Sequence, residues 1–165
     1  MGSGIVIYRH GQNIKTLQYK LNKKCTNNQA EQLAILKALQ YIDKTQIADK
    51  KATIYTDSQT TLDMLKYSQI HTNIVEEIRR QWYAIKKAGC QITLQWVKAH
   101  AGTRGTELAD AIAKKAATNG TIPESFTRIP KSVELRQLEE ESLQSDREPG
   151  PKQLKEGRRK NNSQI

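Results

Sequence analysis

The stretch from residue 4 to residue 21, GIVIYRHGQNIKTLQYKL, decides how this chain begins to fold. Its first residues are mostly apolar and β-branched, and a turn sequence, HGQN at residues 10–13, follows them. After the turn, Leu17, Tyr19 and Leu21 alternate with polar residues, as in a strand that buries one face. The stretch therefore predicts two antiparallel strands joined by a tight turn.

Helices and further strands follow in an order that indicates the fold class. The stretch from the capping residues 26–28 to Ile42 is rich in Ala, Leu and Gln, which predicts a helix. We expect the remaining elements to be a strand at Ala52–Thr56, a short helix at Ser58–Leu65, a helix at Asn73–Lys87, a strand at Ile92–Val97 and a helix at Thr106–Ala117. An antiparallel start followed by helix-linked parallel strands predicts an α/β fold, with a mixed sheet flanked by helices.

The composition changes after Gly120. Pro123 and Pro130 interrupt the chain, and residues 145–165 carry almost no apolar side chains. We therefore predict one folded domain over residues 1–119 and an extension over residues 120–165, with one helix at 132–144 and a disordered tail.

Charge is distributed unevenly between these two parts. The net charge is +10, and residues 1–122 hold 18 Lys and Arg against 9 Asp and Glu, whereas residues 123–165 hold 9 against 8. A basic folded part suits a polyanion partner such as nucleic acid, although a basic protein without such a partner has the same charge. The sequence has no apolar run long enough for a membrane span and no signal peptide pattern, so we expect an intracellular protein, cytoplasmic or nuclear.

Three acidic residues lie at the ends of predicted elements. Glu31 shares a helix face with buried apolar positions, and the alternative is a carboxylate near a helix N-terminus that turns into water. Asp57 ends a predicted strand, where α/β sheets bind ligands, although an aspartate there also caps a following helix. Asp110 lies in the first turns of the last helix, which is also an ordinary place for a surface aspartate.

Taken together, these carboxylates suggest one metal site. Oxygen ligands from two helix starts and one strand end suit hard cations such as Mg²⁺. His100 lies in a glycine-bearing loop before the last helix, where a mobile imidazole would move protons near such a site. Zinc is not expected, because Cys25 and Cys90 lack the spacing of zinc ligands.

Three motifs follow one another along the chain: TNNQAE at residues 26–31, YTDSQ at residues 55–59 and a longer stretch at residues 96–110. The first two resemble the TNNxxE and TDSQ motifs of the type 1 ribonuclease H family. WVKAHAGTRGTELAD at residues 96–110 resembles its WVKxHxG and ExAD segments. ELADAIAKKAA at residues 107–117 and IPKSVELRQLEEESL at residues 129–143 are similar to the domain that closes the polyproteins of non-LTR retrotransposons.

The resemblance implies a two-metal endonuclease that cuts the RNA strand of RNA–DNA hybrids. It implies that Glu31, Asp57 and Asp110 bind two Mg²⁺ ions, with Mn²⁺ as an alternative, and that no small-molecule cofactor is needed. It also implies that His100 assists proton transfer and product release. An upstream reverse transcriptase domain in a longer polyprotein would be a partner.

The resemblance also implies how the hybrid is held. Asn27 and Gln59 match positions that contact the minor groove, where the 2′-hydroxyl distinguishes RNA from DNA. Thr26 and Asn28 match positions that help to hold a backbone phosphate.

One part of the family pattern is missing from this sequence. Family members carry a central strand that ends in DGS, with the first catalytic aspartate, whereas residues 1–30 here contain no acidic residue. We therefore expect a fold without that strand, with the edges of Ile5–Tyr8 and Ala52–Thr56 open to aggregation or to a borrowed strand. We also expect weak Mg²⁺ binding and little hybrid cleavage. The alternatives are a catalytically impaired module that only binds nucleic acid, and a protein that interacts through residues 123–165.

Overall fold

A computed structural model describes residues 1–45, 51–99, 104–128, 135, 136 and 138 of this chain. Met1–Pro130 form one compact unit, and Lys131–Ile165 form another. The first unit therefore continues beyond residue 119, where the composition suggested a boundary. Of the helix expected at 132–144, Leu135, Arg136 and Leu138 are helical, and the other residues lie outside the described ones.

The chain begins with the hairpin that its sequence predicts. β1 (Gly2–Arg9) and β2 (Gln12–Leu21) pair in antiparallel fashion. His10 and Gly11 connect the two strands with φ angles of 50° and 77°. Two successive positive φ angles make the kind of turn whose twist matches that of the flanking strands, and so favour a tight hairpin.

α1 (Asn27–Thr45) supplies much of the core. The helix begins in a capping box: the Gln29 amide donates to the Thr26 hydroxyl at 3.2 Å, and the Thr26 amide donates to the Gln29 side-chain oxygen at 3.0 Å. One apolar cluster joins the buried face of the helix to residues before and after it: Leu21, Cys25, Ala30, Leu33, Ile35, Leu36, Leu39, Ile74, Ile78 and Ile85. The helix therefore anchors the elements on both sides of it.

β3 (Lys51–Thr56) and β4 (Gln91–Trp96) run parallel in a second sheet. α2 (Gln59–Lys66) and α3 (Asn73–Lys87) lie between them in the sequence, and α3 packs on α1. α3 is one continuous helix, as its capping and periodicity predict.

Arg79 of α3 holds the connection between α2 and α3. Its guanidinium donates to the carbonyl oxygens of Met64, Tyr67 and Ile70 at 2.8, 2.6 and 2.7 Å. It also donates to Glu76 at 2.6 Å, and this hydrogen bond lowers the pKa of the Glu76 carboxyl group. The end of α2 is therefore tied to the start of α3 by one side chain.

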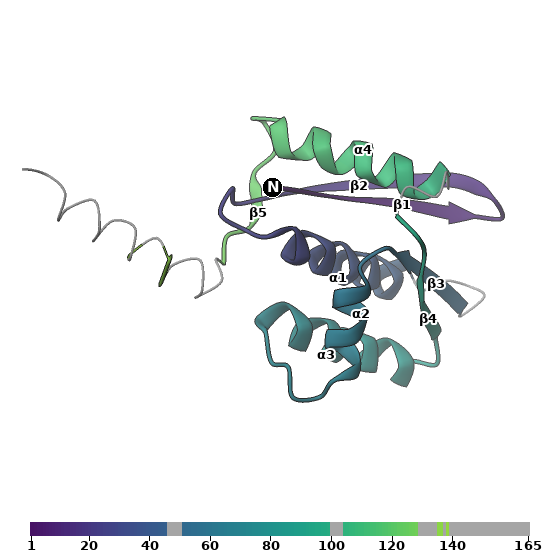
Figure 1. Ribbon diagram of the computed structural model, residues 1–165. Coiled ribbons are helices and arrows are strands. Elements are labelled where there is room, and N and C mark those ends of the chain that lie inside the picture. The colour runs from purple at the N-terminus through teal and green to yellow at the C-terminus, as the bar shows by residue number, and fades with distance from the viewer. Residues whose placement is uncertain (46–50, 100–103, 129–134, 137, 139–165) are drawn as a thin grey trace, which may run out of the picture. The chain divides into compact units, whose positions relative to one another are not determined.

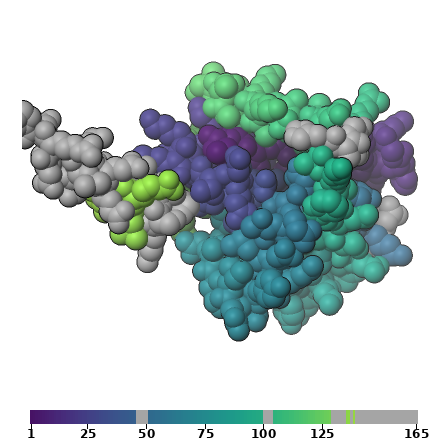
Figure 2. Space-filling view, in the orientation of Figure 1, coloured from purple at the N-terminus to yellow at the C-terminus, as the bar shows by residue number. Residues whose placement is uncertain are grey.

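α4 (Arg104–Thr118) and α1 lie on opposite faces of the hairpin sheet (Figure 1). In the space-filling view, the green atoms of α4 lie over the dark purple atoms of β1 (Figure 2). The contact is close because a Cβ atom on Gly4 would lie 2.2 Å from the Ala109 carbonyl oxygen, nearer than side-chain atoms approach backbone. Glycine at this strand position thus permits α4 to lie against the sheet.

The described strands form two separate sheets, in the orders β1-β2-β5 and β3-β4. β5 (Glu124–Phe126) pairs in parallel with β2, which makes the first sheet mixed. The predicted α/β class, with a mixed sheet flanked by helices, is confirmed. Within the described ranges, no helix combines the length and the apolar character of a membrane-spanning segment.

Candidate active site

Asp57 follows the last residue of β3, at the carboxyl end of the second sheet. Its backbone carbonyl accepts a hydrogen bond from the Trp96 indole at 3.2 Å and one from the Gln59 amide at 3.1 Å. Ser58 caps α2, because its hydroxyl accepts from the Thr61 amide at 3.3 Å. The alternative that Asp57 is the cap is therefore wrong, and the exposed Asp57 carboxylate remains available to a ligand.

A chain of hydrogen bonds joins the start of α2 to the start of α1. The hydroxyl oxygens of Ser58 and Thr61 lie 2.8 Å apart, and the Thr61 hydroxyl donates to Asn28 Oδ1 at 3.1 Å. The Asn28 side-chain amide also donates to Met64 Sδ at 3.5 Å. Ser58 and Thr61 are 5% and 0% exposed. Because buried polar groups hold their partners firmly, this chain fixes Asp57 relative to the first turns of α1.

Glu31 lies three residues after Asn28 on α1, and its side chain is half-buried. The hydrogen bond between Asn28 and Thr61 brings this part of α1 next to α2, and Asp57 stands just before α2. The structure therefore places Glu31 and Asp57 at the same end of the first unit, where α1 begins and β3 ends.

Of the four residues that are predicted to contact the hybrid, two have exposed side chains and two have side chains that form hydrogen bonds within the fold. Asn27 and Gln59 are exposed first residues of α1 and α2, and the Gln59 side-chain amide donates to Asp63 Oδ1 at 2.9 Å. Thr26 caps α1, and Asn28 takes part in the buried chain with Thr61. Asn27 and Gln59 are thus presented to solvent by helices that the other two residues help to position.

Asp110 comes from α4, next to Ala109, whose carbonyl oxygen lies beside Gly4 of β1. Its carboxylate is exposed and lies 2.6 Å from Lys114 Nζ, one turn further along the helix. This is the ion pair that an ordinary surface aspartate makes at this spacing. In this structure Asp110 is therefore an exposed, ion-paired residue, as in the alternative of a surface aspartate.

The predicted metal ligands have suitable chemistry, but they do not form a compact group. Among the described residues, no set of three or more His, Cys, Asp and Glu side chains could hold a metal ion together. Glu31 belongs to α1 and Asp110 to α4, and these helices cover opposite faces of the hairpin sheet (Figure 1). His100 lies outside the described residues. The arrangement as it stands does not fit a three-carboxylate metal centre.

Two residues that hold the site were not recognised from the sequence. Trp96 ties the end of β4 to the Asp57 carbonyl, and Thr61 links α2 to α1. The position of Trp96 at the end of its strand gave a usable signal, because strands that lie side by side bring their ends together. Thr61 gave none, since its partner Asn28 lies 33 positions away in the sequence.

Comparisons with known proteins all lead to one family. The family model described as RNase H matches residues 1–118. Ribonuclease HI of Haemophilus influenzae is 32% identical over 132 residues, which cover 73% of this chain and 82% of that protein. Ribonuclease H of Neorickettsia sennetsu is 29% identical over 136 residues, with 73% and 84% covered. Ribonuclease HI of Vibrio cholerae is 34% identical over 133 residues, with 73% and 80% covered.

Proposed function

This chain belongs to the RNase H family, and on that premise we propose that it hydrolyses the RNA strand of RNA–DNA hybrids, in place of the little cleavage expected from the sequence alone. The observation that carries the proposal is the family match over residues 1–118, which includes every element around Asp57. The exposed Asp57 carboxylate, held at the end of β3 by Trp96 and by the capped helix α2, is the centre of the proposed site.

We propose that Glu31, Asp57 and Asp110 are the ligands of divalent ions, Mg²⁺ or Mn²⁺. Carboxylate oxygens are the donors that these hard cations prefer. Two such ions, when bound, would activate the attacking water and stabilise the leaving 3′ oxygen. For Asp110 to serve, its carboxylate must leave Lys114 Nζ, 2.6 Å away. His100 is proposed to assist proton transfer and product release.

Hybrid recognition is proposed to rest on the two helix starts beside Asp57. Asn27 and Gln59 are exposed there, within reach of a nucleic-acid groove in which the 2′-hydroxyl marks the RNA strand. Thr26 and Asn28 support this surface from within, and the phosphate contact proposed for them would come from the same helix start. The basic excess of residues 1–122 supports affinity for a polyanion.

The sequence of residues 107–117 and 129–143 further supports a retrotransposon origin, with a reverse transcriptase domain as partner. This part of the proposal is tested by reading the coding sequence around the gene. A reverse transcriptase reading frame continuous with this chain is expected, and a free-standing cellular gene in its place would contradict the retrotransposon origin.

The test of the proposed hydrolysis separates cleavage from binding. A hybrid with a labelled RNA strand is incubated with the chain and Mg²⁺, and shortening of the RNA is followed on a gel while binding is followed by fluorescence anisotropy. Asp57→Asn is expected to keep binding and to lose cleavage, because the amide is a poorer ligand for a hard cation.

Asp43→Asn is the matched control, since Asp43 is an exposed aspartate near the opposite end of α1 whose partner is Gln81. It is expected to leave cleavage unchanged. Hybrid binding by the unaltered chain without any RNA shortening would contradict the proposal and favour a binding-only module.

A further inference from the structure

After α4 ends, the chain returns to the start of α1. β5 pairs in parallel with the end of β2, and the residues that follow it pass beside the first turn of α1 (Figure 1). We call residues 124–128 the strap. All of them belong to the first compact unit.

Two hydrogen bonds fix the beginning of the strap to the end of β2. Asn22 directly follows the last residue of β2, and its backbone amide donates to the Phe126 carbonyl oxygen at 3.0 Å. The Asn22 side-chain amide donates to Glu124 Oε2, also at 3.0 Å. The Glu124 carboxylate is therefore engaged at this end of the strap.

The other end of the strap is fixed to the first turn of α1. The Gln29 side-chain amide donates to the Arg128 carbonyl oxygen at 3.0 Å, and Cys25 Sγ lies 3.9 Å from the same oxygen. Gln29 is itself held by the capping box, in which its side-chain oxygen accepts from the Thr26 amide at 3.0 Å. Because both polar atoms of the Gln29 side chain have partners, the backbone of Arg128 has a defined place beside α1.

The strap thus brings an arginine to the surface that carries Asn27. Arg128 lies 99 positions after Gln29 in the sequence, and Asn27 lies two positions before Gln29 on the same helix turn. The side chains of Asn27 and Arg128 are both exposed. An arginine from the far part of the first unit therefore stands next to a proposed hybrid contact.

The charges around Arg128 suit an anionic ligand. None of the ion pairs found among the described residues involves Arg128. Lys23 and Lys24, which precede α1, are exposed, and the strap's own carboxylate, on Glu124, is bonded to Asn22. A guanidinium group presents its donors in a planar fork that matches the oxygens of a phosphate.

We propose that Arg128 binds a backbone phosphate of the RNA–DNA hybrid, beyond the phosphate contact proposed for Thr26 and Asn28. The inference rests on the proposed function, because the hybrid is placed here by the proposed contact of Asn27. A phosphate contact fixes the register of the duplex and adds affinity without reading sequence. The strap thereby lengthens the surface along which the first unit holds its substrate.

The test compares two substitutions that each remove one positive charge. Arg128→Gln removes the proposed contact and spares the bond from Gln29, which is made to the backbone of Arg128. Lys51→Gln is the matched control, because Lys51 is exposed, forms none of the ion pairs among the described residues and begins β3, at the opposite end of that strand from Asp57. Long-range attraction to a polyanion falls equally in the two variants.

Binding of a fluorescently labelled hybrid is measured by anisotropy across a salt series. Arg128→Gln is expected to weaken binding roughly tenfold, as the loss of a charged hydrogen bond does. It is also expected to lower the slope of affinity against salt by about one, the share of a single phosphate contact. Lys51→Gln is expected to leave the affinity and the slope nearly unchanged.

Two further readouts separate a phosphate contact from a structural role. Arg128→Lys keeps the charge and loses the planar fork, so it is expected to keep the salt slope of the unaltered chain and to bind with an affinity between the other two. In the cleavage assay, Arg128→Gln is expected to raise KM and to leave kcat unchanged, since the proposed contact is with the duplex backbone and not with the reacting atoms.

The outcomes distinguish this inference from the proposed hydrolysis. Hybrid binding that is unaffected by Arg128→Gln, or weakened equally by Lys51→Gln, would overturn the inference and leave the hydrolysis intact. Binding that depends on Arg128 without any shortening of the RNA would support the inference and contradict the hydrolysis. Absence of hybrid binding by the unaltered chain would contradict both.

Discussion

Thr61 links the two helices that carry the proposed site. Its side chain is fully buried, and its hydroxyl stands between the Ser58 hydroxyl and the Asn28 side-chain oxygen. A methyl group in its place would leave Asn28 Oδ1 without this donor in a buried setting. The substitution would therefore remove the hydrogen bond between Thr61 and Asn28, which holds α2 and the preceding Asp57 next to the start of α1.

We therefore expect Thr61→Val to lower the free energy of unfolding by about 1–3 kcal/mol, the penalty for an unsatisfied buried polar group. Urea denaturation measures the change. Thr60→Val is the control, because Thr60 is exposed on the same helix, and its effect is expected within about 0.5 kcal/mol. Equal stability of the Thr61→Val and unaltered chains would show that the hydrogen-bond chain does not hold α2.

Single residues also mark the limit of what the sequence predicted. The place of Asp57 after a strand followed from local alternation and was correct. The roles of Thr61 and Trp96 depend on partners 33 and 39 positions away in the sequence, which no local pattern encodes. The pairing of Asp110 with Lys114 is local, yet the sequence alone could not decide between this pair and a metal ion.

α4 lies against the hairpin sheet only because β1 carries small residues beneath it. A Cβ atom on Gly2 would lie 2.1 Å from the Ala113 carbonyl oxygen, and one on Gly4 would lie 2.2 Å from that of Ala109. Both contacts are with backbone, which cannot turn aside as a flexible side chain does. Asp110 follows Ala109, so the position of this contact also sets the position of a proposed ligand.

We expect Gly4→Ala to displace α4, to lower the free energy of unfolding by about 1–3 kcal/mol through overpacking and to reduce hybrid cleavage. Amide hydrogen exchange along α4, urea denaturation and the cleavage assay together measure this. Gly120→Ala is the control, because a Cβ atom there meets no atom within 4 Å. Unchanged exchange in α4 and unchanged stability for Gly4→Ala would contradict the packing.

The local elements and the parallel course of the helix-linked strands β3 and β4 were predicted well, whereas the pairing of β5 was not. The β1–β2 hairpin and the single helix α3 follow from neighbouring residues, namely a tight turn and a capped apolar stripe. β5 was missed, because it is three residues long and pairs with β2 across more than a hundred positions of sequence. The change of composition after Gly120 predicted a domain boundary at residue 119, and the compact unit that contains β5 runs from Met1 to Pro130.

The distribution of charge over the chain indicates which part of it would dominate electrostatic binding to a hybrid. Residues 1–122 carry a net charge of +9, from 18 basic and 9 acidic residues, and residues 123–165 carry +1. Binding that releases counterions from phosphates weakens as salt rises. The first unit, with its excess of cations, should therefore dominate the salt dependence.

We expect hybrid affinity to fall at least roughly tenfold between about 50 and 200 mM salt, as two or more phosphate contacts require. Fluorescence anisotropy across a salt series measures the slope. Replacing Arg158, Arg159 and Lys160 together by Gln is the control and is expected to leave the slope unchanged. A slope that disappears in this variant would assign binding to residues 123–165 instead.

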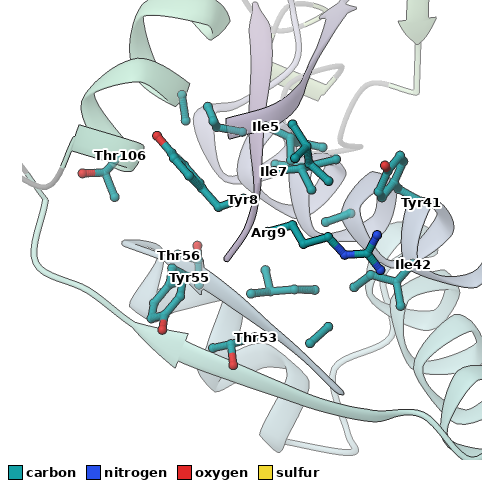
Figure 3. Close-up of a pocket in the computed structure, with 18 of the residues that line it drawn as sticks. Ile5, Ile7, Tyr8, Arg9, Tyr41, Ile42, Thr53, Tyr55, Thr56 and Thr106 are labelled. Carbon is teal, nitrogen blue, oxygen red and sulfur yellow. The ribbon is translucent and has the colours of Figure 1, made fainter. Parts of the chain in front are cut away.

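The α/β class was predictable from the order of elements, whereas the division into two sheets was not predictable from periodicity. The open edges at Ile5–Tyr8 and Ala52–Thr56 were expected from the family resemblance, and in the structure both stretches line one cleft (Figure 3). The sequence predicted one metal site shared by Glu31, Asp57 and Asp110, whereas no three His, Cys, Asp and Glu side chains among the described residues could hold a metal ion together. Local patterns specify elements, and the packing of those elements sets the distances between carboxylates.

Strand-specific cleavage tests the central claim most directly. One RNA–DNA hybrid carries a different fluorescent label on each strand and is incubated with the full chain and Mg²⁺. The proposed function predicts that the RNA strand is shortened, that the DNA strand stays intact, and that Asp57→Asn abolishes the shortening. Two intact strands, or equal cutting of both, would contradict it.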